Sequence, residues 1–578
     1  MFRAFRTEVT ECLREALAEM GHPGIDIGIE EPPGQIDAAL ASNVAFRLAD
    51  LQGQPPQAIA GAVAEAADIT ESRYIGEVSA AGPYVNFSIT PQYLTDTVRK
   101  AMMPTWGQLE STDTSVIIEH TSANPTGPIH VGRARNPIFG DALARVLSAA
   151  GATVERQYYV NDAGRQVATF TWAVEHFGDE VLAAADRDRA DHQLVRYYRH
   201  GSSYLEEADP AEAAAATASI DAIMQGLEAG DQATYERVHA VIGPVLEGMS
   251  ATLRRLGVQF DTFVEESEFI RDGSAEAVID ELQALPESEK QEGAWMLDLS
   301  DAGIDKELVF VRGDGTSLYT TRDLAYHRWK LQAFDEAVTV LGEDHKLQAD
   351  QLRATLELLG EDTAGLAQPW YSWVTLPEGG MSTRAGTGID LDDLLDEAVR
   401  RARAEVTARD PDLDAGTIDA IAHAVGVGAV RYDIISKQPT KGITFDWDRA
   451  LDVEAQSAPY IQYAHARASG IIDAAAAAAV EPMVDESVLE RPVEAAMVRT
   501  IARYPRVIEE AAIELAPHTV ATYVRECAEQ FNQFYREARI IGADDSTLAE
   551  TRLAIVIGAQ STLASGLALL GIDAPEVM

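Results

Sequence analysis

The segment SANPTGPIHVGRARN (residues 122–136) sets a histidine, two glycines and two prolines between two regular apolar stretches. SVIIEHT before it is β-like, and PIFGDALARVLSAAG after it has the spacing of an amphipathic helix. Backbone N–H groups at the start of a helix bind anions, and glycines let a phosphate come close. The segment lacks the GxxxxGK[ST] and GxGxxG patterns, which excludes a P-loop and a dinucleotide fingerprint. We therefore predict another kind of phosphate-binding turn, the alternative being an ordinary turn with a surface histidine.

Two residues of this turn fit a role in phosphate chemistry. His130 can donate a hydrogen bond to a phosphate oxygen in a transition state, and Gly132 leaves space for a flat base. A second polar segment, LPEGGMSTRAGTGIDLDDLLDEA (376–398), follows about 250 residues later. It is rich in glycine, carries one cation and leads into a helix expected from about Leu391. Such a segment is typical of a loop that closes over phosphates.

The two segments together resemble the signature of a known class of enzymes. HVGR (130–133) and GMSTR (380–384) are similar, in order, to the HIGH and KMSKS motifs of class I aminoacyl-tRNA synthetases. Longer segments resemble the arginyl-tRNA synthetase family: EHTSANPTGPIHVGRARNPIFGDALARVL, YYVNDAGRQV, DGTSLYTTRDLAYH, LGEDHKLQ, YIQYAHARASGI, FNQFYREARI and GLALLGIDAPEVM. The chain is identified as a member of that family over nearly its whole length, with the weakest resemblance at about 170–300.

The resemblance implies an α/β fold, with a Rossmann-type class I synthetase catalytic domain, an N-terminal α+β module and a C-terminal all-α anticodon-binding bundle. The residue pattern agrees, because strand, glycine-rich turn and helix alternate from about 113 to 400 and helical spacing dominates afterwards. We expect an N-terminal tRNA-binding module (1–108), a catalytic domain (109–400) with a helical insertion at about 170–300, a helical connecting region that contacts the tRNA stem (401–455) and an anticodon-binding domain (456–578).

The implied activity is that of an arginine–tRNA ligase, which activates L-arginine with ATP to arginyl-adenylate and transfers arginine to tRNA(Arg) for protein synthesis. The resemblance also implies that ATP is a substrate and that Mg2+ accompanies it. The resemblance assigns ATP binding to His130, Gly132, Arg133, Met381, Ser382, Thr383 and Arg384, and catalysis to His130, Gly132, Arg133 and Arg384. It assigns arginine binding to Glu119, Ser122, Asn124, Tyr319 and Asp323. The HIGH-like region comprises Ala123, Asn124, Pro125, Thr126, Gly127, Pro128, Ile129, His130, Val131, Gly132 and Arg133.

The chemistry of the arginine candidates fits a guanidinium substrate, whose five donors need carboxylates and planar acceptors. Tyr319 and Asp323 lie four residues apart and therefore on one face of a helix. By the resemblance they bind the guanidinium side, while Glu119 and Asn124 lie near the α-amino group. On the residues alone, Asp323 is better explained as an ion-pair partner of Arg322 or Arg328, and Tyr319 as a core residue, and only the motif context favours the binding role.

The second motif departs from the family pattern, because Gly380 and Thr383 stand where lysines are usual. Some arginyl-tRNA synthetases carry a compensating lysine just before the HIGH motif, but the matching residue here is Gly127. This leaves arginines as the expected triphosphate cations, namely Arg384 with Arg133 or Arg135. The segment GEDH (342–345) is expected to line the adenosine or arginine pocket. We expect no zinc and no dedicated metal site.

The charge balance is extreme for a chain that has enough apolar residues to form a sizeable hydrophobic core. The 578 residues include 93 acidic and 46 basic ones, for a net charge of −47, and lysine is rare. Such a composition is typical of proteins from a high-salt cytoplasm such as that of a halophilic archaeon, where the Debye length falls to about 3 Å and self-repulsion is screened. A negative net charge normally argues against a nucleic-acid partner. At molar salt that argument loses most of its force, so tRNA(Arg) remains the expected partner.

The location is expected to be cytoplasmic, with no membrane partner and a monomeric state. The first residues are too acidic for a targeting peptide, and we expect no apolar run of bilayer-spanning length. The two cysteines, Cys12 and Cys527, are too few and too far apart for a disulfide framework.

Two other functions stay open on the sequence. One is a catalytically silent tRNA-binding relative that has lost adenylation with the lysines, and the other is a tRNA-independent amino-acid ligase or nucleotidyltransferase. Aromatic and basic residues of the C-terminal bundle could stack on anticodon bases, although helical spacing makes most of them core candidates. These residues are Tyr460, Tyr463, His465, Arg467, Tyr523, Phe531, Tyr535 and Arg539.

Overall fold

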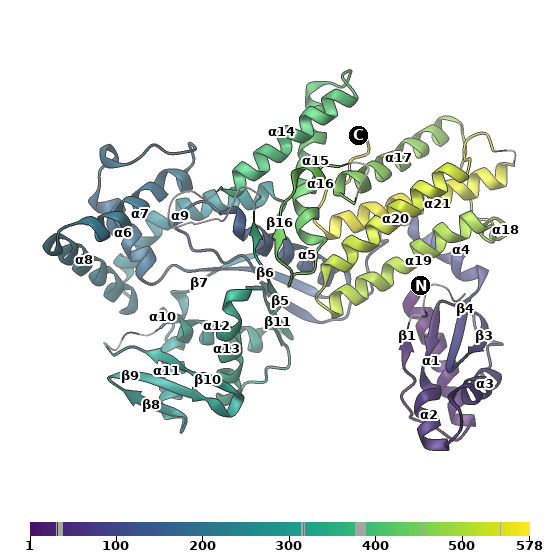
Figure 1. Ribbon diagram of the computed structural model, residues 1–578, viewed down its shortest axis with the longest axis horizontal. Coiled ribbons are helices and arrows are strands. Elements are labelled where there is room, and N and C mark those ends of the chain that lie inside the picture. The colour runs from purple at the N-terminus through teal and green to yellow at the C-terminus, as the bar shows by residue number, and fades with distance from the viewer. Residues whose placement is uncertain are drawn as a thin grey trace.

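The computed structural model describes residues 1–30, 32, 38–313, 316, 318–375, 389–452, 456–543 and 545–578. Figure 1 shows three connected parts: an N-terminal module, a central α/β part with a helical arm and a small sheet, and a C-terminal helical bundle. The N-terminal module lies away from the central sheet. It packs against the bundle through contacts of α4 (Pro91–Ala101) with α19 (Pro492–Ile513) and α21 (Ser546–Leu569).

The central sheet has five parallel strands in the order β13-β11-β5-β6-β7. The chain runs outward from β5 through β6 to β7, and then returns to add β11 on the other side of β5. The carboxyl ends of β5 and β11 therefore form a topological switch point, where open α/β sheets bind ligands. The strands are β5 (Ser115–Glu119), β6 (Thr153–Val160), β7 (Thr262–Glu265), β11 (Glu336–Thr339) and β13 (Leu366–Ala367).

The predicted strand at SVIIEHT is confirmed as β5, and EAVTVLG contains β11. Ile117 and Ile118 are fully buried in β5, as expected for a strand covered on both faces. Strands β6 and β7 were not predicted from the sequence. Polar residues interrupt the apolar pattern of β6, and β7 is only four residues long within a largely helical stretch.

Helices cover both faces of this sheet and continue into the arm. The arm contains α6 (Arg165–His176), α7 (Ala190–Glu207), α8 (Pro210–Glu228) and α9 (Gln232–Arg255), as predicted for the insertion. The remainder of the insertion is not mostly helical. An antiparallel sheet forms there from β8 (Ser288–Gln291), β9 (Ala294–Leu299) and β10 (Ile304–Val311). The other elements of the central part are α5 (Arg135–Ala149), α10 (Glu268–Arg271), α11 (Ser274–Ala284), α12 (Tyr319–Ala333), β12 (Leu341–Gly342), α13 (Lys346–Leu358), β14 (Trp370–Tyr371) and β15 (Val374–Thr375).

The N-terminal module is α+β, as predicted. Its strands β3 and β4 pair antiparallel on either side of the turn at Gly82. The elements are α1 (Phe2–Glu19), β1 (Ile29–Glu30), β2 (Leu40–Ser42), α2 (Val44–Gln52), α3 (Pro56–Ala66), β3 (Ile75–Ala81), β4 (Tyr84–Ile89) and α4 (Pro91–Ala101).

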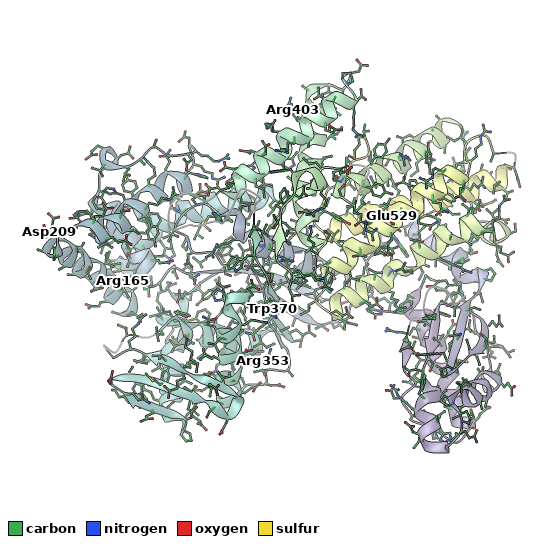
Figure 2. The ribbon with its side chains drawn as sticks, in the orientation of Figure 1. Arg165, Asp209, Arg353, Trp370, Arg403 and Glu529 are labelled. Carbon is green, nitrogen blue, oxygen red and sulfur yellow. The ribbon has the colours of Figure 1, made fainter. Side chains whose placement is uncertain are left out.

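The regular elements described in the carboxyl-terminal third are helices and one short strand. It contains α14 (Leu391–Arg409), α15 (Ala415–Ile435), β16 (Ile443–Thr444), α16 (Trp447–Ala450), α17 (Ala458–Ala477), α18 (Glu486–Leu489), α19 (Pro492–Ile513), α20 (Pro517–Glu537) and α21 (Ser546–Leu569). The helix predicted from about Leu391 is confirmed as α14. Charged side chains are exposed on its helices, for example Arg403 on α14 and Glu529 on α20, both labelled in Figure 2.

Among the described residues, α21 alone is long and apolar enough to cross a membrane by length and composition, with a mean hydropathy of 1.4. The expectation that no run has this length was wrong, because the charged residues of the helix, Glu550 and Arg552, lie near its start. In the structure, 67% of the apolar window is buried, and the helix packs against α17, α20 and α4. It is the core helix of the bundle.

Candidate active site

A pocket of about 230 Å³ opens at the carboxyl ends of β5 and β11. It lies at the switch point of the sheet, where the strand order predicts a ligand. Ten of the residues selected from the sequence, which come from three separate segments, line this pocket. These are Glu119, Ser122, Ala123, Ile129, Arg133, Tyr319, Asp323, Gly342, Asp344 and His345.

The chain leaves β5 through a strained turn. Thr121 and Ser122 have φ values of 71° and 39°, which side-chain-bearing residues rarely adopt. The turn is held by Asn136, whose Oδ1 accepts a hydrogen bond from the Thr121 N–H at 2.7 Å. Ser122 in turn donates to Glu119 Oε1 at 2.9 Å. These contacts fix the first loop against the pocket, and such strain persists where the surroundings hold it in place.

Glu119, at the end of β5, is largely buried and paired with a lysine. Lys330 Nζ, which is fully buried, lies 2.5 Å from Glu119 Oε2 and also donates to Thr339 Oγ1 at 3.1 Å. The ammonium group of Lys330 therefore balances the negative charge of the buried Glu119 carboxylate. Glu119 Oε1 accepts the hydrogen bond from Ser122, and Glu119 lines the pocket.

Tyr319 and Asp323 lie one turn apart at the start of α12 and both line the pocket, as predicted from their spacing. The Asp323 carboxylate pairs with His327 at 3.0 Å. Burial raises the pKa of Asp323, but His327, Lys330 and His345 more than offset this, so the pKa lies below its ordinary value. Asp323 is thus a stable carboxylate that lines the pocket, with 40% of its side chain exposed.

His130 begins a short 3-10 helix, Val131–Arg133, that leads into α5. Its Nδ1 accepts a hydrogen bond from the Gly132 N–H at 3.1 Å, so the ring proton sits on Nε2. Burial and the neighbouring Arg133 lower its pKa, which keeps the ring neutral. The Nε2 atom is buried and has no hydrogen-bond partner in the described part of the chain. His130 and Gly132 lie beside the pocket residues Ile129 and Arg133 but do not themselves line the pocket.

Asn124 lies in the neighbouring hollow, which shares Asn161 and Tyr319 with the pocket. Its Oδ1 accepts from Asn161 Nδ2 at 2.7 Å, and its Nδ2 donates to Gln166 at 2.5 Å. The structure therefore places Asn124 at the rim of the site, next to the arginine candidates rather than among them.

The second loop is described only at its carboxyl end. Met381, Ser382, Thr383 and Arg384, like Gly380, lie outside the described residues. The residues that follow are paired with the first loop: the Val131 N–H donates to Ile389 O at 3.0 Å, and the Leu391 N–H donates to Ile129 O at 2.8 Å. His130 and Asp390 form an antiparallel bridge between them. Two segments that are distant in sequence thus meet at the site.

Arg135 is not available as a triphosphate cation, contrary to the expectation. Its side chain is buried, and its guanidinium donates to the carbonyl oxygens of Ser372 at 2.8 Å, Lys441 at 2.6 Å and Gln438 at 2.7 Å. Burial lowers its pKa to about 10. Arg135 is a structural residue that holds the chain around β15 and β16. Arg133 is exposed and lines the pocket.

Several pocket residues were not among those predicted from the sequence, including Asn161, Glu266, His327 and Gln348. Glu266 is the most unusual of them. Burial raises its pKa to about 7, and the Arg322 guanidinium, 2.6 Å from its Oε1, offsets only part of this rise. It follows β7 directly, and because that strand was not predicted, neither was the position of this carboxyl at the edge of the sheet.

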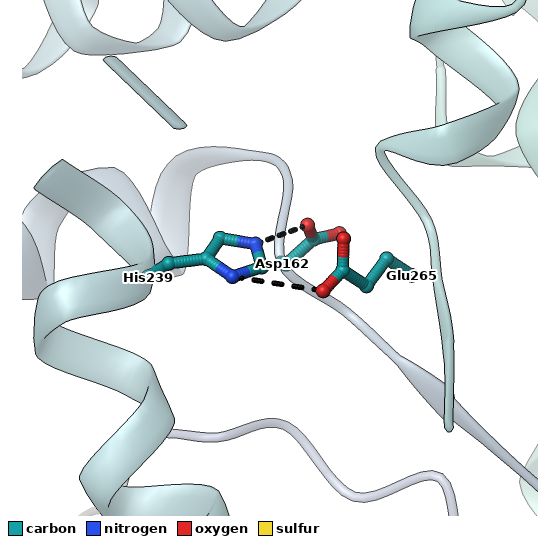
Figure 3. A group of neighbouring side chains, drawn as sticks. All are labelled: Asp162, His239 and Glu265. Carbon is teal, nitrogen blue, oxygen red and sulfur yellow. Dashed lines mark hydrogen bonds and ion pairs between the residues drawn. The ribbon is translucent and has the colours of Figure 1, made fainter. Parts of the chain in front are cut away.

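The residue before Glu266 belongs to a group that fixes the arm to the sheet (Figure 3). His239 on α9 lies between two carboxylates, with its Nε2 3.1 Å from Asp162 Oδ2 and its Nδ1 3.6 Å from Glu265 Oε1. The hydrogen bond to Asp162 raises the pKa of His239, although burial opposes it. Asp162 also accepts hydrogen bonds from the N–H and Oγ of Ser267. The group links α9 to the ends of β6 and β7 beside the pocket.

The aromatic candidates of the bundle divide by exposure. Tyr523, Phe531 and His465 are buried core residues, in line with the core interpretation of their spacing. Tyr463 and Tyr535 are exposed. The Arg467 guanidinium lies over both exposed rings, at 4.6 and 5.0 Å from their centroids.

Comparison with known proteins decides the family. The model described as "tRNA synthetases class I (R), catalytic domain" matches residues 100–447. "Arginyl tRNA synthetase N terminal domain" matches 7–89, and "DALR anticodon binding domain" matches 461–578. A protein of Halorubrum lacusprofundi described as "Arginine--tRNA ligase" is 53% identical over 100% of both chains. This chain belongs to the arginyl-tRNA synthetase family.

Other relatives agree with this assignment. A protein of Haloarcula marismortui, also described as "Arginine--tRNA ligase", is 55% identical over 100% of both chains. The solved structure of Thermus thermophilus arginyl-tRNA synthetase aligns with a TM-score of 0.84 at 29% identity, covering 99% of this chain and 100% of that one. The predicted fold class is confirmed, and the relatives from halophilic archaea fit the acidic composition. The predicted domain boundaries and residue roles stay predictions.

Proposed function

We propose that this synthetase ligates arginine to tRNA: it activates L-arginine with ATP to arginyl-adenylate and transfers arginine to tRNA(Arg). The observation that carries the proposal is the pocket itself. At the switch point of the sheet, carboxylates from β5 and α12 face the HIGH-like loop, so a guanidinium substrate and a nucleotide can lie side by side.

Within the pocket we assign Asp323 and Tyr319 to the guanidinium, and Glu119, with Ser122, to the α-amino group. Asn124 supports this second region from the rim, through Asn161. A cationic substrate needs stable anionic partners. Asp323 meets this requirement because its neighbouring cations hold its pKa down, and Glu119 meets it because Lys330 compensates its burial.

On the ATP side we assign His130, Gly132 and Arg133 to the nucleotide, together with Met381, Ser382, Thr383 and Arg384 of the second loop. Mg2+ accompanies ATP through the phosphate oxygens. Arg133 and Arg384 supply the positive charge that the missing lysines would provide. The enzyme acts as a monomer in the cytoplasm, with tRNA(Arg) as its macromolecular partner.

An exchange assay tests the proposal. The full-length chain at high KCl is supplied with ATP, labelled pyrophosphate and arginine, with and without tRNA. Arginine-dependent exchange that needs tRNA(Arg) supports the ligase. Binding of tRNA without exchange would identify the silent relative, and exchange independent of tRNA with no charging would identify an amino-acid ligase.

Raising the pH from 6 to 8 should improve arginine binding. Because burial raises the pKa of Glu266 to about 7, its carboxyl is mostly protonated at pH 6 and mostly ionised at pH 8. The anion favours a cationic substrate, so the KM for arginine should fall by up to about tenfold across this range. Glu266→Gln should flatten the profile, whereas the exposed neighbour variant Glu268→Gln should retain it. A profile unchanged by Glu266→Gln would remove Glu266 from substrate binding.

Aminoacylation should rise with KCl into the molar range. With a net charge of −47, the surface repels tRNA phosphates at low ionic strength, and salt screens this repulsion. Ordinary basic nucleic-acid binders show the opposite trend, since each neutralised phosphate releases counterions. Circular dichroism and tRNA binding should be followed over one titration, so that folding and binding are separated. A fold stable in dilute buffer, with tRNA affinity that falls steadily from low salt, would contradict this explanation of the charge.

A further inference from the structure

A row of polar side chains on α12 runs from the substrate pocket into the core. Tyr319, Asp323, His327 and Lys330 follow one another at helical spacing, so they share one face of the helix. Tyr319 is exposed, whereas His327 and Lys330 are buried. The first two residues belong to the proposed guanidinium site, and the other two lie beneath it, between α12 and the central sheet.

The Lys330 ammonium group has an acceptor for each of its three N–H groups. Its Nζ lies 2.5 Å from Glu119 Oε2, 3.1 Å from Thr339 Oγ1 and 3.4 Å from His327 Nε2. It also lies over the ring of Tyr326, 3.9 Å from the ring centroid. A buried charge is tolerated where such partners surround it. Lys330 is therefore held in one position relative to the ends of β5 and β11.

The contact with Lys330 also fixes the tautomer of His327. A lysine can only donate, so the Nε2 atom that faces it carries a lone pair, and the ring proton lies on Nδ1. Thr339 Oγ1 lies 3.1 Å from the same Nε2, and its hydroxyl can donate to this lone pair. Nδ1 faces two acceptors of Asp323, the carbonyl oxygen at 2.9 Å and the carboxylate Oδ1 at 3.0 Å. His327 thus links Lys330 to the Asp323 carboxylate.

Two carboxylates of the pocket are thereby joined through one buried network. It runs from Glu119 through Lys330 and His327 to Asp323, and both end residues line the pocket. Carboxylates around one pocket repel each other, and burial favours their protonated forms. Lys330 opposes both effects at Glu119. Burial raises the pKa of Asp323, but His327 and then Lys330 are among the groups that bring it below its ordinary value.

We propose that Lys330 is a positioning residue that holds Glu119 and Asp323 at the separation of the two cationic ends of arginine. Lys330 is not among the residues that line the pocket, so it acts through the two carboxylates. In this role it makes the pocket selective for length, because an amino acid that is one methylene too long cannot place both its ammonium and its guanidinium group correctly. The inference rests on the proposed function, whose substrate supplies the two charges.

Pyrophosphate exchange with arginine and with L-homoarginine, which is one methylene longer, tests the inference. The assays contain ATP and saturating tRNA(Arg) at high KCl. Lys330→Met removes the ammonium group and keeps an unbranched side chain. Its KM for arginine should rise by about 10- to 100-fold, because Glu119 loses a charged hydrogen-bond partner, while the KM for ATP changes little. The ratio of kcat/KM for arginine to kcat/KM for homoarginine should fall by about tenfold or more, since one methylene contributes about 10- to 200-fold in a well-defined pocket.

Two further variants separate positioning from a loss of stability. Arg552→Met is the matched control, because it removes a buried cation that lies 2.7 Å from Glu494 in the bundle. It should lower the unfolding temperature and leave the arginine–homoarginine ratio unchanged. His327→Leu keeps the buried ion pair of Lys330 but removes its link to the second carboxylate, and it should also lower the ratio. This variant decides the question where Lys330→Met does not fold.

Coupling within the network gives a second criterion. The effects of Lys330→Met and Asp323→Asn on the KM for arginine should be less than additive, since both disrupt the same arrangement. Additive effects would overturn the inference, and so would a folded Lys330→Met or His327→Leu that keeps the wild-type ratio. In both cases the wild type would still show arginine-dependent exchange. A wild type without this exchange would overturn the proposed function, and this inference with it.

Discussion

Replacing Asp323 by asparagine should increase the KM for arginine by a factor of between about 30 and a few thousand, while changing the KM for ATP little. Truncating one partner of a desolvated, hydrogen-bonded charge pair costs about 2–5 kcal/mol, and each 1.4 kcal/mol is tenfold. Asp323 lines the pocket and is held as a carboxylate, so asparagine removes the charge and keeps the shape. Exchange kinetics with arginine and ATP varied separately measure the two constants.

Citrulline, the neutral analogue of arginine, sharpens this test. If Asp323 binds the charged guanidinium group, Asp323→Asn should lower the ratio of kcat/KM for arginine to kcat/KM for citrulline. A residue that only supports His327 would instead change stability and kcat and leave this preference intact. The exposed variant Asp301→Asn, on the short helix between β9 and β10, is the charge-matched control. If Asp323→Asn left the KM for arginine unchanged and weakened ATP binding, Asp323 would belong to the ATP side of the pocket and its assignment to arginine would be wrong.

The sequence predicted those parts of the site that lie in one continuous segment. The change from the apolar run of β5 to a glycine-rich turn and then to helical spacing located the first loop. The four-residue spacing of Tyr319 and Asp323 predicted their common face on α12. Both follow from local periodicity, which needs no knowledge of the rest of the fold.

The parts that depend on tertiary packing could not be obtained in this way. The positive charge of Lys330 balances the negative charge of Glu119, although the two residues are 211 positions apart in the sequence. No rule of local spacing connects residues so far apart. Glu266 follows a strand too short to recognise. Arg135 was taken for a phosphate cation because a sequence shows that an arginine is charged and not that its guanidinium is buried among carbonyl groups.

Removing the imidazole of His130 should slow adenylate formation by about 100- to 1000-fold. The Gly132 N–H fixes the tautomer, so Nε2–H is a single oriented donor, and it is buried without a partner in the described chain. A donor held in advance at a developing negative charge contributes about 2.7–4 kcal/mol to the transition state, and little to ground-state binding. His130→Ala should therefore lower kcat for pyrophosphate exchange and leave the KM for ATP nearly unchanged.

Two further variants separate this donor role from a structural one. His130→Gln places an amide N–H near the position of Nε2 and should recover part of the rate, whereas His130→Ala should not. His423→Ala, at an exposed histidine on α15, should behave as the wild type. If His130→Ala lowered thermal stability and raised the KM for ATP by the same factor as it lowered kcat, the histidine would act only by holding the turn. Because Nδ1 accepts from a backbone N–H that begins the 3-10 helix, loss of that bond alone costs about 0.5–1.5 kcal/mol. That is too little to produce the predicted loss of rate, so the size of the kcat effect distinguishes the two roles.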